Sequence, residues 1–149
     1  MIQYVKGDIF QGEDDVIVHG CNCMNNMASG VAYQVAKYYP EAVYVDIKTV
    51  KGDPTKLGTY TSWTGQHRFH RDRAITIVNA YTQFLPVVSL KPFDYDAFAT
   101  VLPKIKADFA GKTIATVRIG AGLAGGEWSR IEATINQVFN DQTIKVYVL

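Results

Sequence analysis

The chain has 149 residues, with 15 Lys and Arg against 14 Asp and Glu, which gives a formal net charge of +1. This length fits one hydrophobic core, so we expect a single domain over residues 1–149. A hydrophobic fraction of 48% with 19% charged residues excludes a disordered protein. The near-neutral charge argues against a surface that binds duplex nucleic acid by neutralising its phosphates.

The chain shows no signal for secretion or for a membrane. It does not open with a basic segment followed by an apolar one, and no apolar run approaches the roughly 18 residues of a membrane span. Cys21 and Cys23 are separated by one residue, a spacing that is poor for a mutual disulfide and favours reduced thiols. We therefore expect a cytoplasmic protein with no membrane partner.

The first half of the chain predicts two strands and then two helices, over residues 2–5, 15–20, 30–39 and 43–50. The apolar run that begins at Val16 is typical of a central strand buried on both faces. Val31 and Val35 share one face of the first helix, and Pro40 ends it.

The second half predicts strands over residues 59–63 and 74–81, a helix over 94–110, a strand over 113–119, a helix over 128–140 and a strand over 143–149. Pro103 lies inside the third helical pattern, so we expect a kink there or a later start of the helix. The alternation predicts an α/β domain of three layers, α/β/α, with a mixed and mostly parallel central sheet.

Two junctions between a strand and a helix are rich in small residues, over residues 21–30 and 120–126. Small residues let backbone N–H groups approach an anion, and the following helix N-terminus adds a partial positive charge. Two such loops facing each other would suit a pyrophosphate, and the alternative is a pair of tight turns without a ligand. The second loop also spells G-x-G-x-x-G, but its place in the last strand–helix unit disfavours a Rossmann dinucleotide site.

Four segments in order carry a family resemblance: Gly7-Asp8-Ile9, Val18-His19-Gly20-Cys21-Asn22, Ser29-Gly30-Val31-Ala32 and Ile119-Gly120-Ala121-Gly122-Leu123. Together they resemble the motifs of the macro domain family. Residues 19–23, followed by Gly30-Val31-Ala32-Tyr33-Gln34, are most similar to the ADP-ribose 1″-phosphate phosphatases of that family. The resemblance implies the macro-domain fold and removal of the terminal phosphate from ADP-ribose 1″-phosphate.

The resemblance also implies roles for named residues. His19 would carry the chemistry, as a general base on water or as the nucleophile on phosphorus, with Asn22 as the second catalytic residue beside the distal ribose. Asp8 would hold the adenine, although an Asp at this point is also a common turn or capping residue. The full ligand-binding set is Asp8, Ile9, Asn22, Ala28, Ser29, Gly30, Val31, Gly120, Ala121, Gly122, Leu123 and Ala124.

Other functions stay open. Ala124 stands where the related ADP-ribose glycohydrolases carry an Asp, and no matching Lys follows the strand over 74–81, so glycohydrolysis is disfavoured. The sparse acid–base groups leave a module that binds ADP-ribose without turnover as an alternative. The partner is then a small molecule, ADP-ribose or its 1″-phosphate, and the protein a monomer.

Two further clusters have plain explanations. His19, Cys21 and Cys23 lack the spacing and the second ligand pair of a zinc site, so we expect neither a metal nor another cofactor. The basic segment over residues 67–73 predicts a solvated hairpin loop, with attraction of an acidic substrate as the alternative.

Overall fold

The computed structural model describes residues 1–28, 30–86, 92–122 and 124–149, and these form one six-stranded sheet with helices on both faces. The strands are β1 (Ile2–Lys6), β2 (Val16–Asn22), β3 (Tyr60–Gln66), β4 (Ala74–Gln83), β5 (Ile114–Thr116) and β6 (Ile144–Val148). The helices are α1 (Gly30–Tyr38), α2 (Pro40–Ile47), α3 (Tyr95–Asp108) and α4 (Trp128–Val138), with short 3-10 turns η1 (Ile9–Gln11) and η2 (Pro54–Lys56). Among these described residues, no helix is both long enough and apolar enough to cross a membrane.

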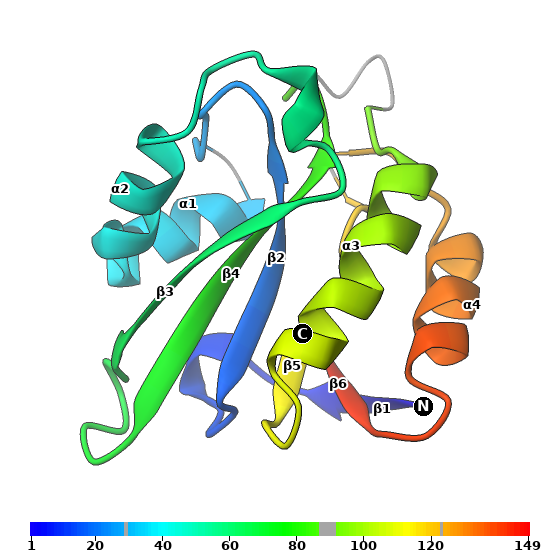
Figure 1. The fold of residues 1–149 in the computed structure, drawn as a ribbon. Helices are drawn as coiled ribbons and strands as arrows, with labels where there is room; N and C mark the ends of the chain where they lie inside the picture. The colour runs from blue at the N-terminus through cyan, green and yellow to red at the C-terminus, as the bar shows by residue number, and fades with distance from the viewer. Residues whose placement is uncertain (29, 87–91, 123) are drawn as a thin grey trace.

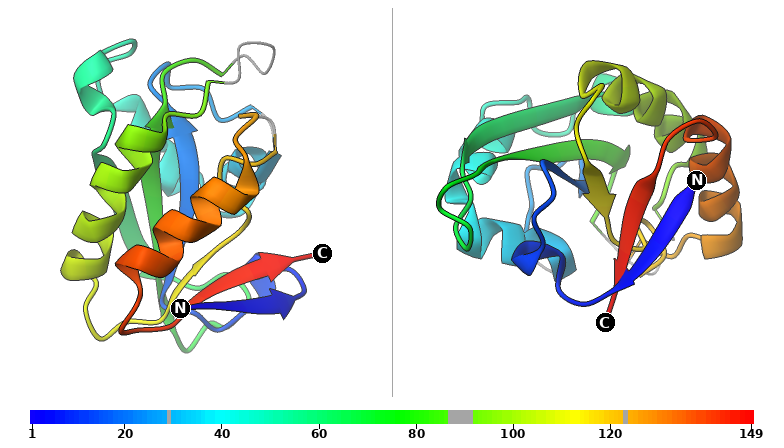
Figure 2. Two further views of the ribbon diagram at one scale, coloured as in Figure 1. Left: turned by 90° about the vertical axis from the view of Figure 1, so that its right-hand side faces the viewer. Right: turned by 90° about the horizontal axis from the view of Figure 1, so that it is seen from below.

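The sheet has the strand order β1-β6-β5-β2-β4-β3, in which β3 pairs antiparallel with β4 and the other neighbours pair in parallel. Figures 1 and 2 show α1 and α2 together on one side of the sheet and α3 and α4 together on the other. The predicted three-layer α/β/α fold with a mixed, mostly parallel sheet is confirmed.

Strand β2 shows why the two layers form. Val16 and Val18 belong to the apolar cluster under α3 and α4, whereas Ile17 belongs to the cluster under α1 and α2. Successive side chains of a strand point to opposite faces, so a continuous apolar run buries both. By the same alternation His19 lies on the α1 and α2 side, at the end of the strand where the site begins.

The strand ends differ from the sequence-based prediction. Strand β2 continues to Asn22 because β4 is also longer than expected and pairs with it as far as Gln83. Strand β5 ends at Thr116, three residues before the predicted end at 119, where the chain turns and Ile119 donates its N–H to the carbonyl of Val117. Helix α3 begins at Tyr95 and contains Pro103 within its length, so the later start is wrong.

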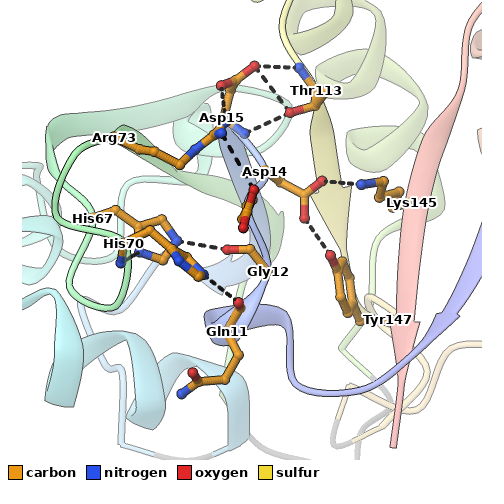
Figure 3. A network of polar contacts seen from close by, with 11 residues as sticks. Gln11, Gly12, Asp14, Asp15, His67, His70, Arg73, Thr113, Lys145 and Tyr147 are labelled. Atoms are coloured by element: carbon orange, nitrogen blue, oxygen red, sulfur yellow. Dashed lines mark hydrogen bonds and ion pairs between the residues drawn. The ribbon is translucent and has the colours of Figure 1, made fainter.

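The basic segment over residues 67–73 does join β3 to β4 as a hairpin, but it is not simply solvated (Figure 3). His67 is fully buried, and its Nε2 lies 2.9 Å from the carbonyl oxygen of Gly12. His70 reaches the carbonyl of Gln11 at 2.7 Å, and Arg73 forms an ion pair of 3.2 Å with Asp15. These contacts tie the hairpin to the segment that leads into β2, because that segment presents carbonyl oxygens and a carboxylate to it.

Candidate active site

A pocket with a volume of about 250 Å³ opens at the carboxyl ends of β2 and β5. In open α/β sheets this edge is where ligands bind. The start of α1 supplies Gly30, Val31 and Ala32 to its wall, and the loop after β5 supplies Gly120, Gly122 and Ala124. The first small-residue segment thus reaches the pocket through its last residue, Gly30, and the second segment through Gly120, Gly122 and Ala124. The remaining lining residues are His19, Gly20, Gln83, Pro86, Val117, Arg118 and Ile119.

Glycine is required in the second loop at Gly120. Its φ is +77°, and a Cβ atom there would lie 2.4 Å from the ring of Phe93. The N–H of Gly126 donates to the carbonyl of Gly120 at 2.7 Å, which folds the loop back on itself. A residue with a side chain could not adopt this tight backbone without strain, so the loop presents backbone here instead of a side chain.

His19 is the ionisable side chain buried deepest in the pocket wall. It is 1% exposed, and its Nε2 lies 2.7 Å from Oδ1 of Asn79. Burial lowers the pKa of His19 to about 4, which the hydrogen bond to Asn79 offsets only in part. The imidazole is therefore neutral at pH 7 and keeps one ring nitrogen with a free lone pair.

The two cysteines beside His19 are buried and unpaired. The Sγ of Cys21 lies 3.6 Å from Nε2 and 3.8 Å from Nδ1 of His19. Burial raises the pKa of both thiols, so they stay protonated at neutral pH and are poor nucleophiles. Among the residues described, no three His, Cys, Asp or Glu side chains gather closely enough to hold a metal ion.

Several predicted site residues lie elsewhere. Oδ1 of Asp8 accepts a hydrogen bond of 2.9 Å from the N–H of Phe10, so Asp8 has the capping role named as its alternative, and Ile9 after it is buried in the core. Asn22 closes its own turn, donating to the carbonyl of Asn26 at 2.8 Å and accepting from the N–H of Met24 at 2.9 Å.

Five residues of the predicted ligand-binding set do not line the pocket in this structure: Asp8, Ile9, Asn22, Ala28 and Ala121. Their ligand contacts stay predictions, while Ser29 and Leu123 lie outside the described residues.

Sequence reasoning missed two polar residues of the pocket, Gln83 and Arg118. Arg118 is exposed, and its guanidinium carbon lies 6.0 Å from the centre of the Tyr4 ring. In the sequence it is only a lone cation two residues before Gly120, inside the predicted strand over residues 113–119. Gln83 carries no signal of a site, because the sequence predicts that the strand before it ends at residue 81.

No family model matches the chain. It is 36% identical over 143 residues to the uncharacterized 17.5 kDa protein in the tk-vs intergenic region of Enterobacteria phage T4, an alignment that covers 91% of this chain and 88% of that one. It is also 40% identical over 50 residues to an ADP-ribose 1″-phosphate phosphatase of Saccharomyces cerevisiae, which covers 31% of this chain and 28% of the yeast protein.

Solved structures share the whole architecture at low sequence identity. The macrodomain of Mycobacterium tuberculosis DarG has a TM-score of 0.77 at 21% identity and covers 100% of this chain and 98% of its own. Thermosipho africanus DarTG in complex with ADP-ribose has a TM-score of 0.74 at 14% identity and covers 99% of this chain and 41% of its own.

Proposed function

The chain belongs to the family of the uncharacterized 17.5 kDa protein of phage T4 and has the macrodomain fold, and from this premise we propose that it binds ADP-ribose 1″-phosphate and removes the terminal phosphate. The observation that carries the proposal is the position of His19, a neutral imidazole in the wall of a pocket that the start of α1 and the loop after β5 also line. The short likeness to the yeast phosphatase supports the same reaction.

The two loops would hold the pyrophosphate. Gly30 begins α1, so the unpaired N–H groups of its first turn and the positive end of the helix dipole lie at the pocket. The loop that contains Gly120 and Gly122 also lines the pocket and would add further backbone amides. Arg118 at the pocket supplies a positive charge for an anionic substrate.

The reaction breaks the bond between phosphorus and the 1″ oxygen, and a water oxygen replaces that bond. The products are ADP-ribose and inorganic phosphate. His19 would either take a proton from the water or attack the phosphorus itself and form a phosphohistidine that water then hydrolyses. Both routes need an unprotonated ring nitrogen, and a pKa of about 4 keeps one available at pH 7.

The test is phosphate release from ADP-ribose 1″-phosphate by the wild-type protein and by His19→Ala. We expect kcat to fall by about 100-fold or more in the variant, the usual contribution of such a group. Calorimetry with ADP-ribose serves as the control, because a folded variant keeps its loop amides and should bind within a few-fold of the wild type. Equal rates for both proteins, or no release by either, would remove the phosphatase assignment.

The second candidate is a module that binds ADP-ribose without turnover. It is favoured by the pocket lining of the described residues, in which His19 and Arg118 are the ionisable side chains and Gln83 and Ala124 carry no acid or base. Calorimetric binding of ADP-ribose without phosphate release would select this function. Absence of binding at millimolar ADP-ribose would rule out both proposed functions, the phosphatase and the binding module.

A further inference from the structure

A row of polar side chains crosses three neighbouring strands behind the pocket. Register places Asn79 of β4 between His19 of β2 and Thr61 of β3. His19 and Asn79 are buried, in a layer otherwise filled by apolar side chains such as Ile17 and Ile77. Buried polar side chains in folded proteins almost always have hydrogen-bond partners, so the partners of this row show how its side chains are oriented.

The orientation of the Asn79 amide follows from its neighbours. Its Nδ2 lies 3.0 Å from the carbonyl oxygen of Ala42 in α2, which can only accept, and 3.2 Å from Oγ1 of Thr61. The NH₂ group therefore faces α2 and β3, and Oδ1 faces His19 as an acceptor. His19 must then carry its proton on Nε2, which leaves Nδ1 unprotonated.

The row continues to a buried carboxylate. Tyr81 lies two residues after Asn79 on the same face of β4, and its hydroxyl donates to Oδ1 of Asp46 at 2.7 Å. That hydroxyl has one proton, so the 3.0 Å contact with Thr61 has Thr61 as the donor. Each donor from His19 through Asn79, Thr61 and Tyr81 thus points toward Asp46, the arrangement in which successive hydrogen bonds polarise one another.

We infer that Asn79 is a positioning residue that holds His19 as the Nε2–H tautomer, and that Asp46 strengthens this contact through Tyr81 and Thr61. The catalytic consequence rests on the proposed function. When Nδ1 gains a proton or a phosphoryl group, the ring becomes positive and Nε2–H becomes a stronger donor. A polarised chain that ends in a carboxylate stabilises that charged state more than the neutral one.

Other charged or titratable groups face the two ends of the row. At the Asp46 end, Nζ of Lys56 lies 5.0 Å from the centre of the Tyr81 ring and partly balances the carboxylate. At the His19 end, the neighbour is the protonated thiol of Cys21. No other side chain among the described residues contacts a ring nitrogen of His19 within hydrogen-bond distance.

The tautomer is tested on the wild-type protein without ligand. Long-range ¹H–¹⁵N NMR of the histidine ring at pH 7 should show an unprotonated Nδ1 and a protonated Nε2 for His19. A protonated Nδ1, or a mixture of tautomers, would overturn the inference. This measurement does not depend on turnover, so a protein that shows the expected tautomer but releases no phosphate keeps the inference and loses the proposed function.

The role of Asp46 is tested by Tyr81→Phe against Tyr60→Phe. Both tyrosine hydroxyls donate to an Asp, but Tyr60 reaches Asp108 outside the row. Tyr81→Phe should lower kcat about fivefold, the worth of one hydrogen bond, with KM within twofold, and should move the His19 Nε2–H proton resonance upfield. Tyr60→Phe should do neither. Asp46→Asn, which keeps an acceptor for Tyr81, should move the resonance in the same direction, and an unchanged resonance in both Tyr81→Phe and Asp46→Asn would refute the role of Asp46.

Discussion

Lys56 shows how one buried side chain shapes the loop that leads to α1. It is only 7% exposed, and its Nζ donates to Oδ1 of Asn25 at 2.8 Å, to the carbonyl of Cys23 at 3.2 Å and to the carbonyl of Val50 at 3.3 Å. Asn25 has a positive φ of 54°, a backbone conformation that needs such support. The ammonium group therefore holds residues 23–25 in place directly after β2.

Replacing this lysine tests that role. Lys56→Met keeps the length of the side chain but removes the three hydrogen bonds of the ammonium group, while the carbonyls of Cys23 and Val50 keep the N–H groups of Gly52 and Asp53 as donors. The free energy of unfolding should therefore fall by about 2 kcal/mol. Lys48→Met is the matched control, because Lys48 is exposed and should change stability by less than about 0.5 kcal/mol. Urea unfolding at pH 7 measures both, and equal losses would show that the three contacts contribute nothing specific.

The loop between β5 and α4 offers a comparison between two of its own glycines. Gly120 has a positive φ and no room for a Cβ beside Phe93, whereas nothing lies within 4 Å of a Cβ at Gly122. Gly120→Ala should therefore destabilise the protein by about 2 kcal/mol or more, through backbone strain and displacement of the Phe93 ring. Gly122→Ala should stay within about 0.5 kcal/mol of the wild type. Thermal unfolding of the two variants decides, and similar melting temperatures would refute the requirement for glycine at 120.

Elements with a clear apolar period were predictable from the sequence, and the ends of strands were not. The run at Val16 identified β2, but its last residues depend on pairing with β4, which one strand's sequence does not encode. The same uncertainty hid Gln83 and Arg118, because each lies where a strand proved longer or shorter than its pattern.

Roles of single polar residues were harder to predict than positions. Asp8 and Asn22 stand where the family resemblance assigns ligand contacts, yet both side chains bond to backbone groups within four residues. Short Asp and Asn side chains can bond to nearby backbone groups in many turns, and the sequence does not show whether such a side chain binds the backbone or a ligand. The family resemblance indicates His19, whereas its partner Asn79 depends on cross-strand register.

At the scale of the whole molecule, two buried histidines link stability to pH. His19 lies at the carboxyl edge of the sheet and His67 at the opposite edge, where Figure 3 shows it against Gly12. Nδ1 of His67 accepts the N–H groups of Phe69 and His70 at 3.1 and 3.0 Å, so a proton there would break both contacts. Burial lowers the pKa of both imidazoles in the folded protein.

The fold should therefore lose stability as the pH falls from about 6.5 toward 4. In that interval unfolded histidines bind protons and the buried ones do not, so the unfolded state gains protons first and ∂ΔG/∂pH is positive. For His19, the fall from 6.5 to a pKa of about 4 amounts to a loss of about 3 kcal/mol of folding stability by pH 4, with His67 adding to it in the same direction.

Urea unfolding of the wild type and of His19→Gln between pH 7 and 4 separates the His19 contribution from the titration of carboxylates, because both proteins share the carboxylates. The variant starts from a lower stability, and its curve against pH should be flatter by the His19 contribution. Parallel curves would mean that His19 takes up its proton in the folded state as readily as in the unfolded chain.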